Sequence, residues 1–221
     1  MRKFLGCFTL LLAAVSTGYA VPVLAPPSPA CSSFGSGPAN DISIAFAVWS
    51  AAGFNCESGD KIFSNFAFSG ALPTDTTLEL QTQTLGPIDL HGVTWNSNFI
   101  GSFSASYDIA VDLVMSPNMR IVRVSGDLSN PSNLGTPTNV KQLFLESGAP
   151  DGTLTSTAGS PGTPLVVDTT ALHVVDTYTP LGGAAVSISN TFAEAAVPEP
   201  VSLFLMGSGL LVLAKLKRAR V

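Results

Sequence analysis

Two cysteines and two histidines are the residues of this 221-residue chain best suited to chemistry. Cys31 and Cys56 are the only cysteines that follow the N-terminal apolar segment. In an oxidising compartment two such cysteines most simply pair, and closing a loop of about 25 residues would stabilise the fold by about 3.5 kcal/mol. The alternative is a catalytic thiol, which needs a free sulfur and a histidine close in space.

The histidines and carboxylates show no local metal or acid–base motif. His91 lies beside a predicted turn and His173 on a predicted strand, and neither has a second histidine or a cysteine at ligand spacing. A metal site built from them would need ligands from distant parts of the sequence. We therefore expect each histidine to lie at the surface, or in the core with its hydrogen bonds made. Asp108, Asp112 and Asp127 alternate outward on predicted strands, which an exposed sheet face explains better than acid–base catalysis.

Four aromatic residues could stack on sugar rings, but scattered aromatics in a sandwich usually belong to its core. They are Trp49, Trp95, Tyr107 and Tyr178. The sequence has no nucleophile elbow, phosphate loop or calcium loop, and Asp151-Gly152 and Gly182-Gly183 are predicted to be turns. We therefore expect no catalytic residue, no metal and no cofactor.

The elements that would carry these residues are strands. From Ile42 onward, short alternating runs rich in Val, Ile, Phe and Thr are interrupted by turn residues about every ten positions. The predicted strands are 61–68, 77–84, 93–100, 103–115, 119–127, 140–146, 172–178 and 186–192. Residues 41–54 fit strand slightly better than helix. Strands without long helices predict an all-β, antiparallel β-sandwich or jelly-roll-like domain over 41–196.

One hairpin can be predicted in detail. Proline suits the second position of a turn over 116–119. Pairing around that turn would place Leu113 opposite Val122 and Val111 opposite Val124 on the core face, with Asp112 opposite Arg123 outside.

The charge of the middle of the chain excludes some partners. Between Asp41 and Glu194 there are fourteen acidic residues and four basic ones, a formal charge of −10. Such a domain is not expected to bind nucleic acid or anionic lipid.

The N-terminus has the pattern of a secretory signal peptide. Residues 1–20 combine a basic start, an apolar run and the small residues Gly18 and Ala20, which predicts cleavage between Ala20 and Val21. The partners would be the Sec translocon and signal peptidase. Residues 21–40, rich in Pro, Ala and Ser, are expected to form an extended leader.

The C-terminal 25 residues, 197–221, have three parts. Pro198 and Pro200 prevent helix around Val197 and Glu199, so this strip should be extended. The uncharged run 201–214 would be a helix in a bilayer, although it covers only about 21 Å of a core roughly 30 Å thick. A basic cluster follows and would remain in the cytoplasm: Lys215, Lys217, Arg218 and Arg220.

This tripartite pattern, Val-Pro-Glu-Pro, apolar helix and terminal basic cluster, resembles the sorting signal of PEP-CTERM proteins. Residues 55–66, with Cys56 and Gly59-Asp60-Lys61, are similar to a stretch common in the ectodomains of that family. The resemblance implies processing near the Pro-Glu-Pro motif by an exosortase. It also implies an inner-membrane precursor and a mature form at the surface of a Gram-negative cell, often alongside exopolysaccharide.

Three functions are compatible with the sequence. The first is a non-enzymatic surface or extracellular-matrix protein, associated with exopolysaccharide and biofilm, and it is the expected one. A polysaccharide-binding module would need exposed, coplanar Trp and Tyr rings. A hydrolase would need a cleft with converging carboxylates or histidine.

Overall fold

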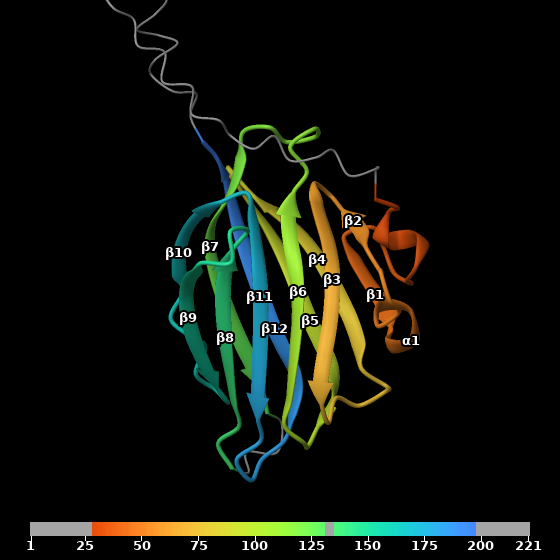
Figure 1. Cartoon of the computed structure of the whole chain (residues 1–221), viewed down its shortest axis with the longest axis vertical. Coiled ribbons are helices and arrows are strands. Elements are labelled where there is room, and N and C mark those ends of the chain that lie inside the picture. Colours follow the sequence, from red (N-terminus) through yellow and green to blue (C-terminus); the bar gives the residue numbers. More distant parts are fainter. Residues whose placement is uncertain (1–27, 131–134, 198–221) are drawn as a thin grey trace, which may run out of the picture.

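Two antiparallel sheets of six strands each face one another in the part of the chain that the computed structural model describes, residues 28–130 and 135–197 (Figure 1). Sheet I has the order β1 (Asp41–Ala45), β4 (Thr77–Leu85), β5 (Ile88–Phe99), β12 (Ala185–Ala196), β7 (Met119–Ser129) and β10 (Leu165–Thr169). Sheet II has the order β2 (Cys56–Ser58), β3 (Lys61–Gly70), β6 (Phe103–Val111), β11 (Ala171–Thr179), β8 (Thr138–Leu145) and β9 (Pro150–Thr157). The all-β, antiparallel prediction is confirmed.

Alternation of side chains along each strand builds the core between the sheets. In β6 every odd position from Phe103 to Val111 is buried, and every even position is partly exposed. The core is rich in rings: Trp49 and Trp95 pack edge to face at 4.9 Å, and Phe66 stacks on Tyr107 at 5.7 Å. Such pairs add to the free energy of burial when they form inside a dry core.

The predicted hairpin between residues 107–115 and 119 onward is wrong. β6 pairs with β3 and β11 in sheet II, whereas β7 pairs with β12 and β10 in sheet I. The strand partners of Arg123 are therefore Ala193 and Val166, not Asp112. The turn itself forms, because the Met119 N–H donates to the Ser116 carbonyl at 3.2 Å, but it belongs to a crossover between the sheets.

The reason lies in the backbone just after β6. The Asp112 N–H donates to the Asp60 carbonyl at 2.7 Å, and the Asp112 carboxylate accepts the Val114 N–H at 2.8 Å. The first bond continues the β3–β6 pairing by one residue, and the second lies in the turn that follows Asp112. Alternation in the sequence reports which face a residue occupies, but it does not report which strand lies alongside.

The edge of the sandwich also differs from the sequence expectation. Residues 150–157 form the edge strand β9, so Asp151-Gly152 lies within a strand and the turn predicted there is wrong. Leu165–Thr169 forms β10, which was not predicted. In the ambiguous region 41–54 the strand β1 is followed at once by a short helix, α1 (Phe46–Trp49).

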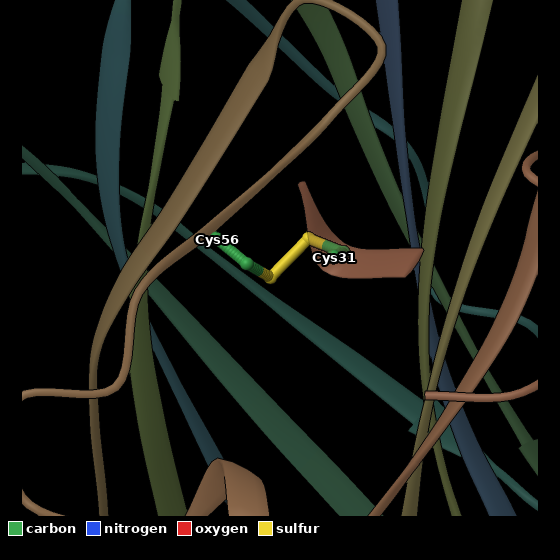
Figure 2. Close-up of a disulfide and its surroundings, with 2 residues drawn as sticks. All are labelled: Cys31 and Cys56. Carbon is green, nitrogen blue, oxygen red and sulfur yellow. A yellow bond between two sulfur atoms is a disulfide. The ribbon is translucent and has the colours of Figure 1, made fainter. Parts of the chain in front are cut away.

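A disulfide joins Cys31 to Cys56, as predicted (Figure 2). Cys31 begins a short 3-10 helix, η1 (Cys31–Ser33), and Cys56 begins β2. Both cysteines are fully buried. The bond therefore fixes the segment that precedes β1 against the first strand of sheet II.

The two predicted address segments lie outside the described residues. This applies to the signal peptide with its Ala20–Val21 cleavage point, to Pro198, Glu199 and Pro200, and to the apolar run and basic cluster. Val197 is described, and its N–H donates to the Asn118 carbonyl at 2.8 Å. Within residues 28–130 and 135–197 no helix is long and apolar enough to span a membrane.

Candidate functional site

Two lysines lie fully buried between the sheets, and each is held by polar groups of the central strand β12. Lys61, on β3, lies against Glu194, and Lys141, on β8, contacts Asn190. Both lysines come from sheet II and both β12 residues from sheet I. Phe192 lies between the two β12 positions on the same strand and is itself buried. Because buried lysines are rare unless paired, these two clusters are the candidate sites.

The Lys61 cluster contains two carboxylates and a histidine. The Lys61 Nζ lies 2.5 Å from Asp60 Oδ1 and 2.6 Å from Glu194 Oε2. His91 Nε2 lies 3.4 Å from the same Asp60 oxygen and 3.7 Å from the same Glu194 oxygen. Neither ring nitrogen of His91 has a hydrogen-bond partner among the described residues.

Burial decides the protonation of this cluster. Desolvation lowers the pKa of His91 to about 4, helped by the Lys61 charge, so the ring is neutral at pH 7. Desolvation also raises the pKa of Glu194 to about 7 against the opposing effect of Lys61. At Asp60 desolvation is the largest single effect and raises the pKa, but the hydrogen bond and charge of Lys61, together with Ser116 and His91, lower it overall.

Asp60, His91 and Glu194 could together hold a metal ion. Their potential ligand atoms lie within 4.8 Å of one another, and imidazole with carboxylate suits zinc. The Lys61 ammonium, however, already lies within hydrogen-bond distance of both carboxylates. A metal ion would have to displace it, so in this arrangement the cation of the cluster is supplied by the chain.

His91 thus lies beside carboxylates that are distant in the sequence, an arrangement that the sequence did not reveal, and its side chain is buried. A hollow of about 350 Å³ beside it is lined by Glu57, Ser58 and Gly59 among others, and by no member of the Lys61 cluster. His91 is 2% exposed and Glu194 is fully buried, while the Asp60 side chain is 14% exposed. The arrangement therefore suits a structural tie better than acid–base chemistry.

The pH dependence of stability tests the protonation states assigned to Glu194 and His91. Glu194 binds a proton in the folded state between pH 4.5 and about 7 but not when unfolded, so its contribution falls as pH rises. His91 binds a proton only when unfolded between about 4 and 6.5, so its contribution rises with pH. The two effects oppose each other in the wild type.

Glu194→Gln should remove the falling contribution and leave a free energy of unfolding that rises by up to about 3 kcal/mol between pH 4 and 6.5. Urea unfolding at a series of pH values measures it. The matched control is Ser187→Ala on the same strand, which should keep the wild-type slope because it changes no ionisable group. Equal slopes in Glu194→Gln and the wild type would contradict the assignment.

The Lys141 cluster is fully buried and joined by several hydrogen bonds. Asp176, on β11, accepts from Lys141 Nζ at 2.5 Å and from Asn139 Nδ2 at 2.8 Å through Oδ1. Its Oδ2 accepts from Asn190 Nδ2 at 2.6 Å. Asn190 also donates to the Tyr107 hydroxyl at 2.9 Å, and its Oδ1 contacts Lys141 Nζ.

The remaining predicted residues lie apart from both clusters. His173 Nδ1 lies 2.5 Å from Asp108 Oδ1 on the outer face of sheet II, and Asn65 Nδ2 donates to the other oxygen of Asp108. Asp127 is exposed, as predicted. The four aromatic residues considered for sugar stacking are fully buried, which confirms that they belong to the core: Trp49, Trp95, Tyr107 and Tyr178.

Sequence reasoning missed Lys61, Lys141, Asp176, Asn190 and Glu194 as a set. One signal was present, because Asp176 occupies an inward position between Val174 and Tyr178 on a strand whose alternation was recognised. A charged residue in an apolar register needs a buried partner. The identity of that partner, 35 residues away on β8, could not be read from the strand alone.

Comparisons with known proteins add little to this picture. No family model matches the chain, and no curated protein matches it. Among solved structures, the enzymatically active domain of tailspike protein 4 of bacteriophage CBA120 aligns with 63% of this chain at 10% identity and a TM-score of 0.30. The alignment spans 20% of the length of the phage chain. A likeness this remote supports no conclusion about function.

Proposed function

We propose that the chain is an exported, non-enzymatic surface or extracellular-matrix protein of a Gram-negative bacterium, with a jelly-roll-like ectodomain and an association with exopolysaccharide or biofilm. It crosses the inner membrane through the Sec translocon, loses its signal peptide, and is held by a short C-terminal transmembrane helix until an exosortase processes it. The observation that carries this proposal is the buried Cys31–Cys56 disulfide, which belongs to an oxidising compartment.

Two further features support a scaffold at the cell surface. Four ionisable side chains between the sheets are fully buried, as expected of structural ties: Lys61, Lys141, Asp176 and Glu194. The central strand β12 ends at Ala196, immediately before the Val197-Pro198-Glu199-Pro200 motif. A processing enzyme would meet an extended strip directly outside the folded domain.

The experiment is a mass measurement on the mature protein from a host that carries an exosortase. We expect the wild type to lack its basic C-terminal cluster. Replacing Pro198-Glu199-Pro200 with three alanines should let helix extend outward and block processing, so that a longer form accumulates in the inner membrane. The matched control replaces Pro27-Ser28-Pro29, another Pro-x-Pro sequence, and should be processed normally.

A wild-type protein that still ends at Val221 in that host would overturn the sorting proposal and favour a permanent single-span anchor. Equal processing of the wild type and the triple-alanine variant would show that Pro-Glu-Pro is not the recognised motif.

A further inference from the structure

We propose that Lys141 and Asn190 become joined by an intramolecular amide bond, from Lys141 Nζ to Asn190 Cγ, which the folded chain forms itself with Asp176 as the proton-transferring group. The bond would be a covalent link between the two sheets. It goes beyond the proposed function and does not depend on it.

The three side chains meet in the geometry that this reaction needs. Lys141 Nζ contacts Oδ1 of Asn190, which is one bond from the Cγ that would be attacked. Asp176 touches both reactants, since its Oδ1 accepts from Lys141 Nζ and its Oδ2 accepts from Asn190 Nδ2, the nitrogen that would leave. Holding reacting groups in contact replaces a bimolecular encounter with a unimolecular step.

The packing around the lysine fixes it in this position. All three side chains are fully buried. Gly126, on β7, pairs with Asn190 and faces the lysine: a Cβ there would lie 3.2 Å from Lys141 Cε and 3.0 Å from a methyl group of Leu154. A glycine at this position therefore leaves room for the lysine stem to reach across the core.

The environment also favours an attacking amine and a durable product. Desolvation lowers the pKa of Lys141, although the Asp176 charge opposes this, so burial makes the neutral amine more accessible than in water. The Tyr107 hydroxyl accepts a hydrogen bond from Asn190 Nδ2 and helps to hold the amide plane. Because the site is closed to water, hydrolysis of the new bond would be slow.

The reaction is balanced without any external reagent. Asp176 takes one proton from the Lys141 ammonium, and the Nζ lone pair then attacks Asn190 Cγ. A second Nζ proton passes through the Asp176 carboxyl to Nδ2 of Asn190, the Cγ–Nδ2 bond breaks, and ammonia leaves. The products are the Lys141–Asn190 amide, one ammonia molecule and the protonated Asp176 carboxyl, so nothing is oxidised or reduced.

Lys61 provides an internal comparison. It is equally buried, but its contacts are carboxylates of Asp60 and Glu194 and the Asp60 carbonyl rather than a side-chain amide. An ionised carboxylate is a poor electrophile and would have to expel an oxygen. We therefore expect Lys61 to remain a free amine.

The test is a peptide map of the folded, full-length protein after cleavage on the carboxyl side of glutamate. Cleavage after Glu79, Glu146 and Glu194 places Lys141 in peptide 80–146 and Asn190 in peptide 147–194, and neither peptide contains cysteine. We expect the two peptides to stay joined, with a mass equal to the sum of the two free peptides minus one ammonia. The intact protein should likewise be lighter by one ammonia molecule.

Variants separate the proposal from other losses of ammonia. Lys141→Arg and Asp176→Asn should each abolish the joined pair and restore the full mass. A succinimide at Asn190 would give the same intact mass, but peptides 80–146 and 147–194 would separate, and that result would overturn the proposal. Unlinked Lys141 and Asn190 in the folded wild type would also overturn the proposal. This measurement uses only the wild type, so it does not depend on whether a variant folds.

Discussion

Asp176→Ala is expected to lower the free energy of unfolding by about 3–5 kcal/mol, because it leaves the Lys141 ammonium buried without its carboxylate. Asn139 and Asn190 would also lose the oxygens to which they donate. Loss of the proposed amide would act in the same direction. Equilibrium unfolding in urea, followed by tryptophan fluorescence, measures the change, since Trp49 and Trp95 are both in the core.

The matched control is an exposed ion pair in the same sandwich. Arg120 Nε lies 3.6 Å from Asp168 Oδ1, and the Asp168 side chain is 77% exposed. Asp168→Ala should change the free energy of unfolding by no more than about 1 kcal/mol, because solvent screens exposed pairs. Similar losses in the two variants would show that burial does not determine the strength of the Lys141–Asp176 interaction.

Reduction of the Cys31–Cys56 disulfide is expected to destabilise the protein by about 3.5 kcal/mol, the loop-closure entropy for a sequence separation of 25. The unfolded chain gains freedom, and the segment carrying η1 is no longer fixed to β2. Guanidinium unfolding with and without reductant measures the difference.

A Cys31→Ala, Cys56→Ala double variant is the control for side effects of the reductant. Its unfolding midpoint should be close to that of the reduced wild type and should not respond to reductant. A wild type whose midpoint is unchanged by complete reduction would show that the bond does not stabilise the sandwich.

The strands could be predicted because each one carries its own pattern. The alternation from Phe103 to Val111 predicts a half-buried strand without reference to any neighbour. Where the pattern is weak, prediction failed: β9 is polar at most positions, as expected of an edge strand, and the Asp151-Gly152 pair within it resembles a turn.

The pairing of strands and the buried clusters could not be predicted in the same way. The hairpin through 116–119 was locally reasonable, yet the chain turns after Asp112 and enters the other sheet. Likewise, Lys141 alternates with Val140 and Gln142, and only the assembled sandwich determines which of the two faces is buried. Convergence of residues 14 to 49 positions apart depends on topology, which is absent from any single strand.

The position of β12 has a mechanical consequence. β12 is hydrogen-bonded on both sides, to β5 and β7, and its last paired residue is Ala196. If the domain is tethered through the residues that follow, drag on the domain is balanced by tension in the tether. That tension pulls on the C-terminal end of β12 and would first open the pairs from Ala196 back toward Glu194. With a covalent link at Asn190, peeling would stop after six residues, and the force would pass into sheet II through Lys141. The sandwich would then resist extension along β12 as one body.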